Sequence, residues 1–396
     1  MVIIMRMDTP YKPEEVNYNR DKFDILDKHF QRMIDKKAAF GAAYCMAREG
    51  KKFVENSIGT MSYDNKDDRQ LRPDAIFWIA SITKLFTATA ILKLVENGEF
   101  RLENSVADLL EEFKKGPFKD INVAALLSHT SGLMPDRGTF INPYFQSPGD
   151  YIREGFAKGE ENWLENALKS GIRTRPDIEW AYSSFGYLVL GEIISRVSGV
   201  FAEDFIQKEI IEPCGMEDTH FKKSLQKKDA ERLVIMNHEN QELVNKLRSD
   251  IEDESSETDK MKSKVPGTEG GLFSTTSDLI KFGNMLMNGG YHGDRRIIGR
   301  LTVDRMTIPY TKSHIKDYCW GAGGVERGYG LGPDLRYNPT SLFTKGSYFH
   351  EGSGASCLMI DPYEKMVAAW VIPFSDYDWH GEGLYNASTI MWSGIL

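Results

Sequence analysis

Apolar and polar residues follow two different spacings along the chain, and these spacings predict where helices and strands lie. Between residues 19 and 37, apolar side chains recur every three or four positions with charged side chains between them, which predicts an amphipathic helix. Two runs of strand-forming residues, 40–49 and 53–62, flank a short turn at 50–52, a pattern typical of a β-hairpin. The N-terminal part is therefore predicted to form a helix followed by a hairpin.

Helical patterns dominate the middle of the chain. The strongly apolar segment 81–97 predicts a helix, and Gly98 is placed to end it. Segment 248–264 has many charges and no apolar spacing, which predicts an exposed loop. The sequence predicts further helices at 121–129, 149–159, 161–170, 183–199 and 201–211.

Strand patterns return toward the C-terminus. Segment 266–290 is typical of a glycine turn, a short strand, an N-capped helix and a glycine stop. The apolar runs 355–361 and 366–374 flank a turn at 362–365, which predicts a second β-hairpin. The last residues, 384–396, predict a terminal helix.

Strand signals thus lie at both ends of the chain with helices between them, and this order predicts the fold class. We expect an α+β fold in which an antiparallel β-sheet is flanked by helices and an all-helical lobe is inserted. Residues 1–100 and 265–396 are expected to form one α/β domain from both chain ends. Residues 101–264 are expected to form the mainly helical lobe, which includes the exposed charged loop.

Composition argues against several classes of function. The chain has 396 residues, 41 % of them hydrophobic, which is enough for a large folded core. Its net charge of −9 argues against a nucleic-acid partner, whose binding surface would be basic. The four cysteines are far apart and form no C-x-x-C pair, so no zinc site or disulfide framework is expected. No apolar run has the length of a signal peptide or membrane span, and we expect a cytoplasmic protein without a membrane partner.

One short motif raises a chemical question, because Ser81 and Lys84 stand three residues apart where the chain enters the apolar helix. Residues at this spacing share one helical face, so the hydroxyl and the amine can meet. Partial burial lowers the pKa of a lysine, which makes it a base for a serine nucleophile. The alternative is an N-cap serine beside a lysine that extends to water. Two other Ser-x-x-Lys sequences, 224–227 and 313–316, lie among charges and indicate exposed surface.

Several further motifs follow in a fixed order. Together with SITK at 81–84, they resemble the serine β-lactamase and penicillin-binding-protein superfamily over nearly the whole chain, and the class C β-lactamase-like branch most. This branch includes family VIII carboxylesterases, D-aminopeptidases and DD-peptidases, and the resemblance implies a β-lactamase/transpeptidase-like fold. The motifs are LLSHTSGL at 126–133, YSSFGYLVLGEIISRVSG at 182–199, GGLFSTTSDLIKFGNMLMNGG at 270–290, GYGLG at 328–332 and HEGSGAS at 350–356.

The resemblance implies roles for residues of two of these motifs, SITK at 81–84 and the motif that begins at Tyr182. Ser81 corresponds to the nucleophile that forms an acyl-enzyme, and Lys84 to the partner that lowers its proton affinity. Tyr182 corresponds to the tyrosine that relays a proton to the leaving group, as a phenol or a phenolate. Ser184, which we assign to substrate binding, occupies the asparagine position of the common Tyr-x-Asn motif.

The third motif is implied to lie on a sheet edge that faces Ser81. His350 stands where many relatives have the lysine of Lys-Thr-Gly, and a histidine there can donate a hydrogen bond to substrate, or become cationic if its pKa rises. Gly352 permits close approach of the acyl group. The backbone N–H groups of Ser81 and Ser353 are implied to form the oxyanion hole.

These departures from the common motifs favour one activity over the others. Ser184 lacks an amide that both donates and accepts toward a β-lactam or a peptide. The third motif lacks a lysine for a substrate carboxylate. We therefore expect a serine hydrolase that acts on small esters, a carboxylesterase. A D-amino-acid peptidase or amidase, a weak β-lactamase, an acyltransferase and a non-catalytic binding homologue are the alternatives.

Other residues and partners carry weaker expectations. No metal or cofactor is expected, because His-Glu-x-x-His, G-x-G-x-x-G and P-loop patterns are missing. The expected partner is a small ester, amide or peptide, and the sequence leaves the oligomeric state open. His129 is expected to make structural hydrogen bonds, and loops 134–162 and 310–345 are expected to shape the pocket. Aromatic residues near such motifs more often belong to the core. Three tryptophans are nevertheless candidates to line the substrate pocket: Trp78, Trp180 and Trp320.

Overall fold

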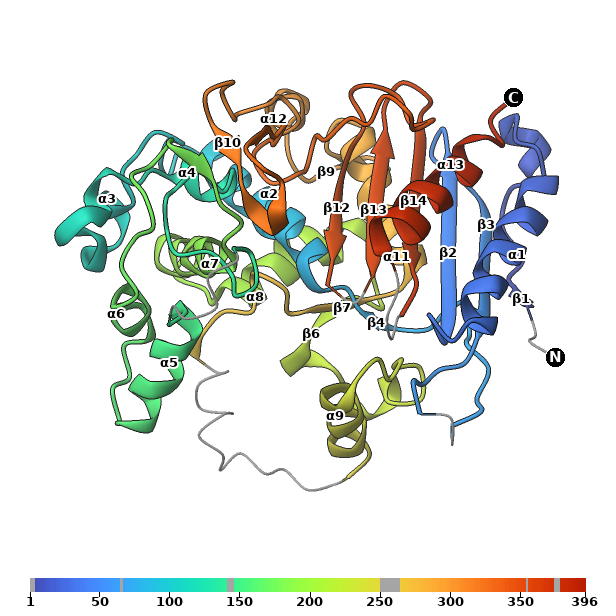
Figure 1. The fold of residues 1–396 in the computed structure, drawn as a ribbon, viewed down its shortest axis with the longest axis horizontal. Helices are drawn as coiled ribbons and strands as arrows, with labels where there is room; N and C mark the ends of the chain where they lie inside the picture. Colours follow the sequence, from blue (N-terminus) through green and yellow to red (C-terminus); the bar gives the residue numbers. More distant parts are fainter. Residues whose placement is uncertain (1–3, 65–66, 141–145, 250–263, 354, 374–377) are drawn as a thin grey trace.

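A six-stranded antiparallel sheet is built from both ends of the chain and lies to one side of the helical region, on the right in Figure 1. The computed structural model describes residues 4–64, 67–140, 146–249, 264–353, 355–373 and 378–396. The strand order is β1-β3-β2-β14-β13-β12. The two ends of the chain meet where β2 pairs with β14. The strands are β1 (Ile4–Arg6), β2 (Gly41–Arg48), β3 (Lys51–Gly59), β12 (Tyr348–Gly352), β13 (Ser356–Asp361) and β14 (Met366–Val371).

Both predicted hairpins are present, and one has a tighter turn than expected. Strand β3 begins at Lys51 rather than after Lys52, because Glu49 and Gly50 form the whole turn with φ angles of 53° and 77°. Positive φ at both central positions matches the twist of the flanking strands in a two-residue hairpin. The second hairpin joins β13 to β14 through the predicted turn at 362–365.

Helices cover both faces of the sheet, which explains why its strands are apolar on both sides. On one face, α1 (Asp21–Asp35) and α13 (Ala387–Trp392) pack against alternate residues such as Tyr44 and Trp370. On the other face, α11 (Thr276–Met287) packs against Cys45 and the residues that share its orientation. The terminal helix and the amphipathic N-terminal helix are therefore confirmed, and they lie side by side (Figure 1).

Helix α2 (Thr83–Glu96) is the buried centre of the second, helical region. It packs against α7 (Ser184–Ser198) and α8 (Ala202–Ile206), and most of its side chains are buried. The predicted helices in this part are present, although most are shorter than their apolar patterns. Further α-helices in the described part of the chain are α3 (Val106–Leu109), α4 (Val123–Leu127), α5 (Pro148–Ala157), α6 (Trp163–Leu168), α9 (His238–Arg248) and α12 (Arg300–Met306).

Two further expectations about this region stay predictions. Residues 250–263 of the charged loop lie outside the described residues, and the domain boundaries at 100 and 265 are likewise still a prediction. Within the part of the chain that the structure describes, no single helix is long and apolar enough to cross a bilayer. Among those described residues, one consecutive pair of segments, Ser184–Ser198 and Ala202–Cys214, reaches that length and composition together, and the pair is bent by 80°.

Short strands outside the main sheet hold distant segments together. In one small sheet, β7 (Leu272–Ser274) lies between β4 (Phe77–Trp78) and β6 (His220–Phe221), so the glycine turn before β7 reaches the start of α2. In another, β10 (Lys316–Asp317) lies between β5 (Glu179–Trp180) and β11 (Val325–Glu326). The second small sheet places the 310–345 segment beside the residues that lead into α7. A two-stranded ribbon consists of β8 (Tyr291–His292) and β9 (Arg295–Arg296).

Candidate active site

Ser81 lies in a sharp turn between β4 and α2. Ala80 has a φ of 44°, a left-handed conformation that costs about 1–2 kcal/mol for a residue with a side chain. The single turn Ala80–Ile82 is a 3-10 helix that continues into α2. In that geometry a residue and its third successor are eclipsed, which places Lys84 beside Ser81. The N-cap of α2 is Ile82, without a side-chain cap bond, so the N-cap alternative for Ser81 is wrong.

Lys84 is fully buried and has three hydrogen-bond partners. Its side chain is 0 % exposed, and Nζ lies 2.9 Å from Ser81 Oγ and 3.3 Å from Ser184 Oγ. A third bond, of 2.6 Å, goes to the backbone carbonyl of Glu269. The alternative of a lysine that extends to water is therefore wrong. Burial lowers the pKa of Lys84 to about 8, because removal from water disfavours the charged amine.

Tyr182 lies against the same pair of side chains. Its phenol lies near enough to the Ser81 side chain for Ser81 to lower the Tyr182 pKa, and Lys84 Nζ lies 4.9 Å from the centre of its ring. Burial is the main cause that raises the pKa of Tyr182 above its ordinary value. The raised pKa favours the phenol over the phenolate among the two forms that the sequence left open. The structure thus brings together the three residues predicted to be catalytic.

Ser184 bonds to a carboxylate that the sequence did not single out. Its hydroxyl donates to Asp136 Oδ2 at 2.6 Å, and its backbone N–H donates to Asp136 Oδ1, also at 2.6 Å. Ser184 is the first residue of α7, where backbone N–H groups have no partner within the helix. Asp136 lies in the 134–162 segment expected to shape the pocket, and no short motif marked it as part of the site.

The third motif lies on β12, the edge strand of the large sheet, next to the turn that carries Ser81. A Cβ atom on Gly352 would lie 2.3 Å from the carbonyl oxygen of Ile79, so only glycine allows this approach. Ser353 is exposed, and residue 354 lies outside the described residues. The oxyanion hole formed by the N–H groups of Ser81 and Ser353 therefore stays a prediction.

His350 on this strand is buried, and both of its ring nitrogens bond to protein groups. Nδ1–H donates to the carbonyl of Glu351 at 2.7 Å, which leaves Nε2 to accept from the Tyr329 hydroxyl at 3.2 Å. Burial, followed by the charge of Lys84, lowers the pKa of His350 to about 4. The ring is therefore neutral near pH 7, and the sequence-based idea that it becomes cationic is not favoured.

With this geometry established, comparison with known proteins identifies the family. The family model described as Beta-lactamase matches residues 26–374, which is most of the chain. The chain belongs to the Beta-lactamase family. Its fold is the β-lactamase/transpeptidase-like α+β fold, as the sequence predicted.

Relatives of this Beta-lactamase family member include both penicillin-binding proteins and esterases. It is 31 % identical to penicillin-binding protein 4* of Bacillus subtilis over 48 % of this chain and 41 % of that protein. It is 28 % identical to esterase EstB of Burkholderia gladioli over 57 % of each chain. These matches span only about half the length of either relative. The crystal structure of a family VIII carboxylesterase superposes with a TM-score of 0.68 at 20 % identity, covering 98 % of this chain and 99 % of that one.

A second acidic residue that sequence reasoning missed is Glu269, whose backbone carbonyl accepts from Lys84 and whose side-chain charge raises the pKa of Lys84. Burial raises the pKa of Glu269 to about 7. Its Oε2 atom is buried and has no hydrogen-bond partner among the described residues. The signal in the sequence is an acidic residue inside the glycine-rich turn that precedes β7. A raised carboxyl pKa next to a lysine with a lowered one is typical of functional sites.

Aromatic rings surround the site on the side of the 310–345 segment. Trp180 is fully buried, whereas Trp320 is 58 % exposed with its ring 5.5 Å from that of Tyr182. His129 has the expected structural role, because its Nδ1 accepts from the backbone N–H of Ser183 at 3.2 Å. Trp78 is half-buried and donates to the Gly270 carbonyl at 2.6 Å. Of the three candidate tryptophans, Trp320 is the one with an exposed ring beside a predicted catalytic residue.

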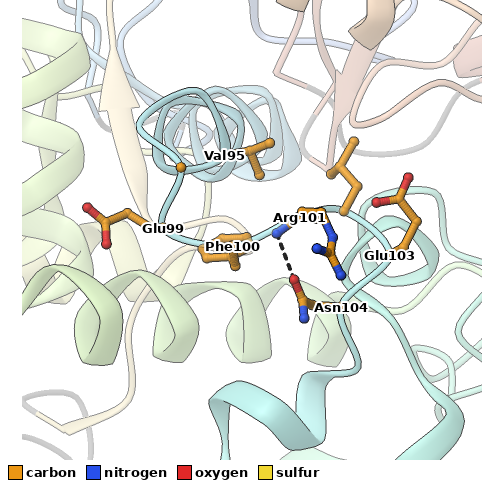
Figure 2. Close-up of a pocket in the computed structure, with 8 residues that line it drawn as sticks. Val95, Glu99, Phe100, Arg101, Glu103 and Asn104 are labelled. Carbon is orange, nitrogen blue, oxygen red and sulfur yellow. Dashed lines mark hydrogen bonds between the residues drawn. The ribbon is translucent and has the colours of Figure 1, made fainter.

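The open pocket shown in Figure 2 lies at the other end of α2. It has a volume of about 510 Å³ and is lined by Val95 and the residues 98–104. Within it, the backbone N–H of Arg101 donates to Asn104 Oδ1 at 2.8 Å. The length of α2 separates it from Ser81 by roughly 20 Å, given the rise of an α-helix. The pocket is therefore distinct from the candidate active site.

Proposed function

We propose that this Beta-lactamase family member is a serine hydrolase that acts chiefly as a carboxylesterase, through an acyl-enzyme on Ser81. The observation that carries the proposal is the buried Lys84, whose amine lies 2.9 Å from Ser81 Oγ and whose pKa is lowered to about 8. A lysine with this pKa is neutral in a substantial fraction near pH 8 and is able to accept the serine proton.

The proposed reaction has two halves. In the first, Lys84 takes the hydroxyl proton of Ser81 while Oγ bonds to the ester carbonyl carbon. The tetrahedral intermediate then collapses: the C–O bond to the alcohol breaks, the alcohol takes the Tyr182 proton, and Lys84 returns a proton to Tyr182. In the second half, water attacks the acyl carbon and gives one proton to the same pair of side chains. The bond between the acyl carbon and Ser81 Oγ then breaks, Oγ takes that proton back, and the carboxylic acid is released.

Two features of the site support esters over β-lactams and peptides as substrates. Ser184, in the position of the usual asparagine, has its hydroxyl bonded to Asp136 and Lys84. His350, in the position of the usual lysine, is buried with a lowered pKa and offers no positive charge to a substrate carboxylate. A simple ester needs neither interaction, because less of the molecule has to be recognised.

Covalent labelling combined with turnover assays tests the proposal. We expect a fluorophosphonate to add to the intact protein, with peptide mapping placing the adduct on Ser81, and p-nitrophenyl butyrate to be hydrolysed faster than nitrocefin. A penicillin adduct on Ser81, with release of D-Ala from short peptides, would instead support a D-amino-acid peptidase. Absence of any adduct and of any turnover would leave the non-catalytic binding homologue.

A further inference from the structure

When the amine of Lys84 is neutral, its three hydrogen-bond partners limit which of them donates to the nitrogen and which accept from it. A neutral amine donates two hydrogen bonds and accepts one. The carbonyl of Glu269, 2.6 Å from Nζ, is purely an acceptor and takes one N–H. The partners that remain are the hydroxyl groups of Ser81 and Ser184, at 2.9 Å and 3.3 Å. Each hydroxyl has one hydrogen, so either could in principle donate to the amine lone pair.

Asp136 removes this ambiguity. The single hydrogen of the Ser184 hydroxyl goes to Asp136 Oδ2 at 2.6 Å, so this hydroxyl accepts from Lys84 rather than donating to it. The second Asp136 oxygen accepts the backbone N–H of Ser184, also at 2.6 Å, which fixes the carboxylate at the start of α7. Both N–H groups of neutral Lys84 are then used, and Ser81 is the partner left for the lone pair.

We propose that Asp136 is a positioning residue that, by holding the Ser184 hydrogen, directs the lone pair of Lys84 toward the hydroxyl of Ser81. The inference rests on the proposed function of Lys84 as the base. When the Ser81 proton moves to Lys84, the O–H bond breaks and an N–H bond forms. The resulting ammonium then donates to all three partners.

The charges that face Lys84 agree with this arrangement. Asp136 is the largest of the charges that raise its pKa, followed by Glu269, while burial is the larger opposing effect. Asp136 therefore stabilises the ammonium formed when Ser81 loses its proton. The other titratable groups close to Lys84 are the phenols of Tyr182 and Tyr187 and the imidazoles of His129 and His350.

A second aspartate of the same segment makes the matched control. At the start of α5, Asp150 Oδ2 accepts both the backbone N–H and the hydroxyl of Ser147, each at 2.8 Å. Asp150 also forms ion pairs with Arg137 and Arg153. Since Arg137 directly follows Asp136, Asp150→Asn loosens the same loop without altering a partner of Ser184.

The test compares Asp136→Asn, Ser184→Ala and Asp150→Asn with the wild type. In Asp136→Asn, Oδ1 can still accept the Ser184 N–H, while the new amide donates to the Ser184 hydroxyl and turns its hydrogen toward Lys84. We expect fluorophosphonate labelling of Ser81 to slow about 100-fold, a size typical of a lost general base. The midpoint of its pH dependence should move down by about one unit, because one opposite charge is removed. Ser184→Ala, which removes the hydroxyl between Asp136 and Lys84, should also slow labelling.

A measurement independent of activity follows the amine itself. In protein labelled with ¹³C at lysine Cε, the Lys84 signal is assigned by its loss in Lys84→Arg and titrated by NMR. The inference expects a lower pKa of Lys84 in Asp136→Asn and no change in Asp150→Asn. It is overturned if Asp136→Asn leaves both the labelling rate and the Lys84 pKa unchanged. A slower rate with an unmoved or raised Lys84 pKa, or equal slowing in Asp150→Asn, would reveal a purely structural role and overturn it too.

The same data separate this inference from the proposed function. If the wild type is neither labelled nor active on esters, yet the Lys84 pKa falls in Asp136→Asn alone, the proposed esterase function fails. The control of Lys84 by Asp136 is then supported. If the wild type is labelled and hydrolyses esters, but Asp136→Asn behaves like the wild type, the function stands and the inference is wrong.

Discussion

The chain contains the pattern Ser-x-x-Lys three times, and the structure gives the three copies different surroundings. In the first copy, Lys84 is fully buried and 2.9 Å from Ser81. In the second, both Ser224 and Lys227 are exposed. In the third, Ser313 is exposed and Lys316, on β10, pairs with Glu326 at 3.1 Å.

The difference lies in desolvation and in long-range partners, because the residue types are the same. A lysine in water keeps its ordinary pKa and is almost wholly protonated near pH 7. Lys84 is removed from water by an apolar helix, and its amine is held by Ser184 and Glu269. We therefore expect chemistry at the first copy alone, and the following predictions test that contrast.

The largest contrast is expected between the three serines. Ser81→Ala should abolish fluorophosphonate labelling and lower kcat for p-nitrophenyl butyrate by roughly four orders of magnitude or more, as loss of a nucleophile does. Ser224→Ala and Ser313→Ala should retain wild-type labelling and wild-type kcat, because both serines are exposed. Turnover by Ser81→Ala near the wild-type rate would contradict the assignment, and mass spectrometry of the intact variants provides the check.

The next largest contrast is expected between two lysines of these motifs, Lys84 and Lys316, in their effect on kcat. Lys84→Met, which fills a similar volume without an amine, should lower kcat about 1,000-fold, since the base is gone. Lys316→Met should have little effect on kcat, because its ion pair with Glu326 is on the surface. Steady-state kinetics on both variants, with thermal unfolding to confirm that they fold, gives the comparison. Similar losses in the two variants would indicate a general effect on folding.

Tyr182 has no counterpart in the other two copies. Tyr182→Phe should lower kcat about 100-fold, because the departing alcohol loses its proton donor. Esters with a good leaving group should suffer less, since nitrophenolate leaves without a proton. The decisive measurement is kcat for p-nitrophenyl butyrate against that for an alkyl butyrate, and an equal loss on both would argue against a role in leaving-group protonation.

The pH dependence should report the environment of Lys84. Burial lowers its pKa to about 8, so the neutral base forms as pH rises through that value. Below the midpoint, we expect kcat/KM for p-nitrophenyl butyrate to rise about tenfold with each unit of pH, and above pH 8 we expect it to level off. A midpoint near the ordinary lysine value would mean that Lys84 reaches water during the reaction.

The smallest effect concerns substrate preference at the mouth of the site. Trp320 exposes 58 % of its surface beside Tyr182, so Trp320→Ala should raise KM for esters of aromatic acids about fivefold, the loss of one aromatic contact. The value of kcat should change little. Equal KM values for benzoate and acetate esters in both proteins would show that this ring does not contact the substrate.

Local patterns predicted much of the fold because they reflect local physics. The amphipathic spacing between residues 19 and 37 marked α1, and the turn at 362–365 marked the second hairpin. Strand β1 was missed, since three residues carry too little alternation to be read without their partner β3. The first hairpin turn was placed one residue too long, because Glu49 adopts a left-handed conformation that its residue type does not signal.

The candidate site divides in the same way. Ser81 and Lys84 are close because they are three residues apart at the start of a helix, and motif order singled out Tyr182, Ser184 and His350. Asp136 and Glu269 were not found, as their meaning comes from contacts across the chain. Lys84 forms hydrogen bonds with Ser184 and Glu269, which lie 100 and 185 positions further along the chain.

By itself the sequence determined the elements, the family resemblance and the residues that are able to react. The tertiary structure decided which of three identical patterns is buried, which carboxylate fixes Ser184, and that His350 is a neutral, fully bonded ring. The physical reason is that helices and hairpins depend on neighbouring residues, whereas desolvation and hydrogen-bond direction depend on segments that only folding brings together.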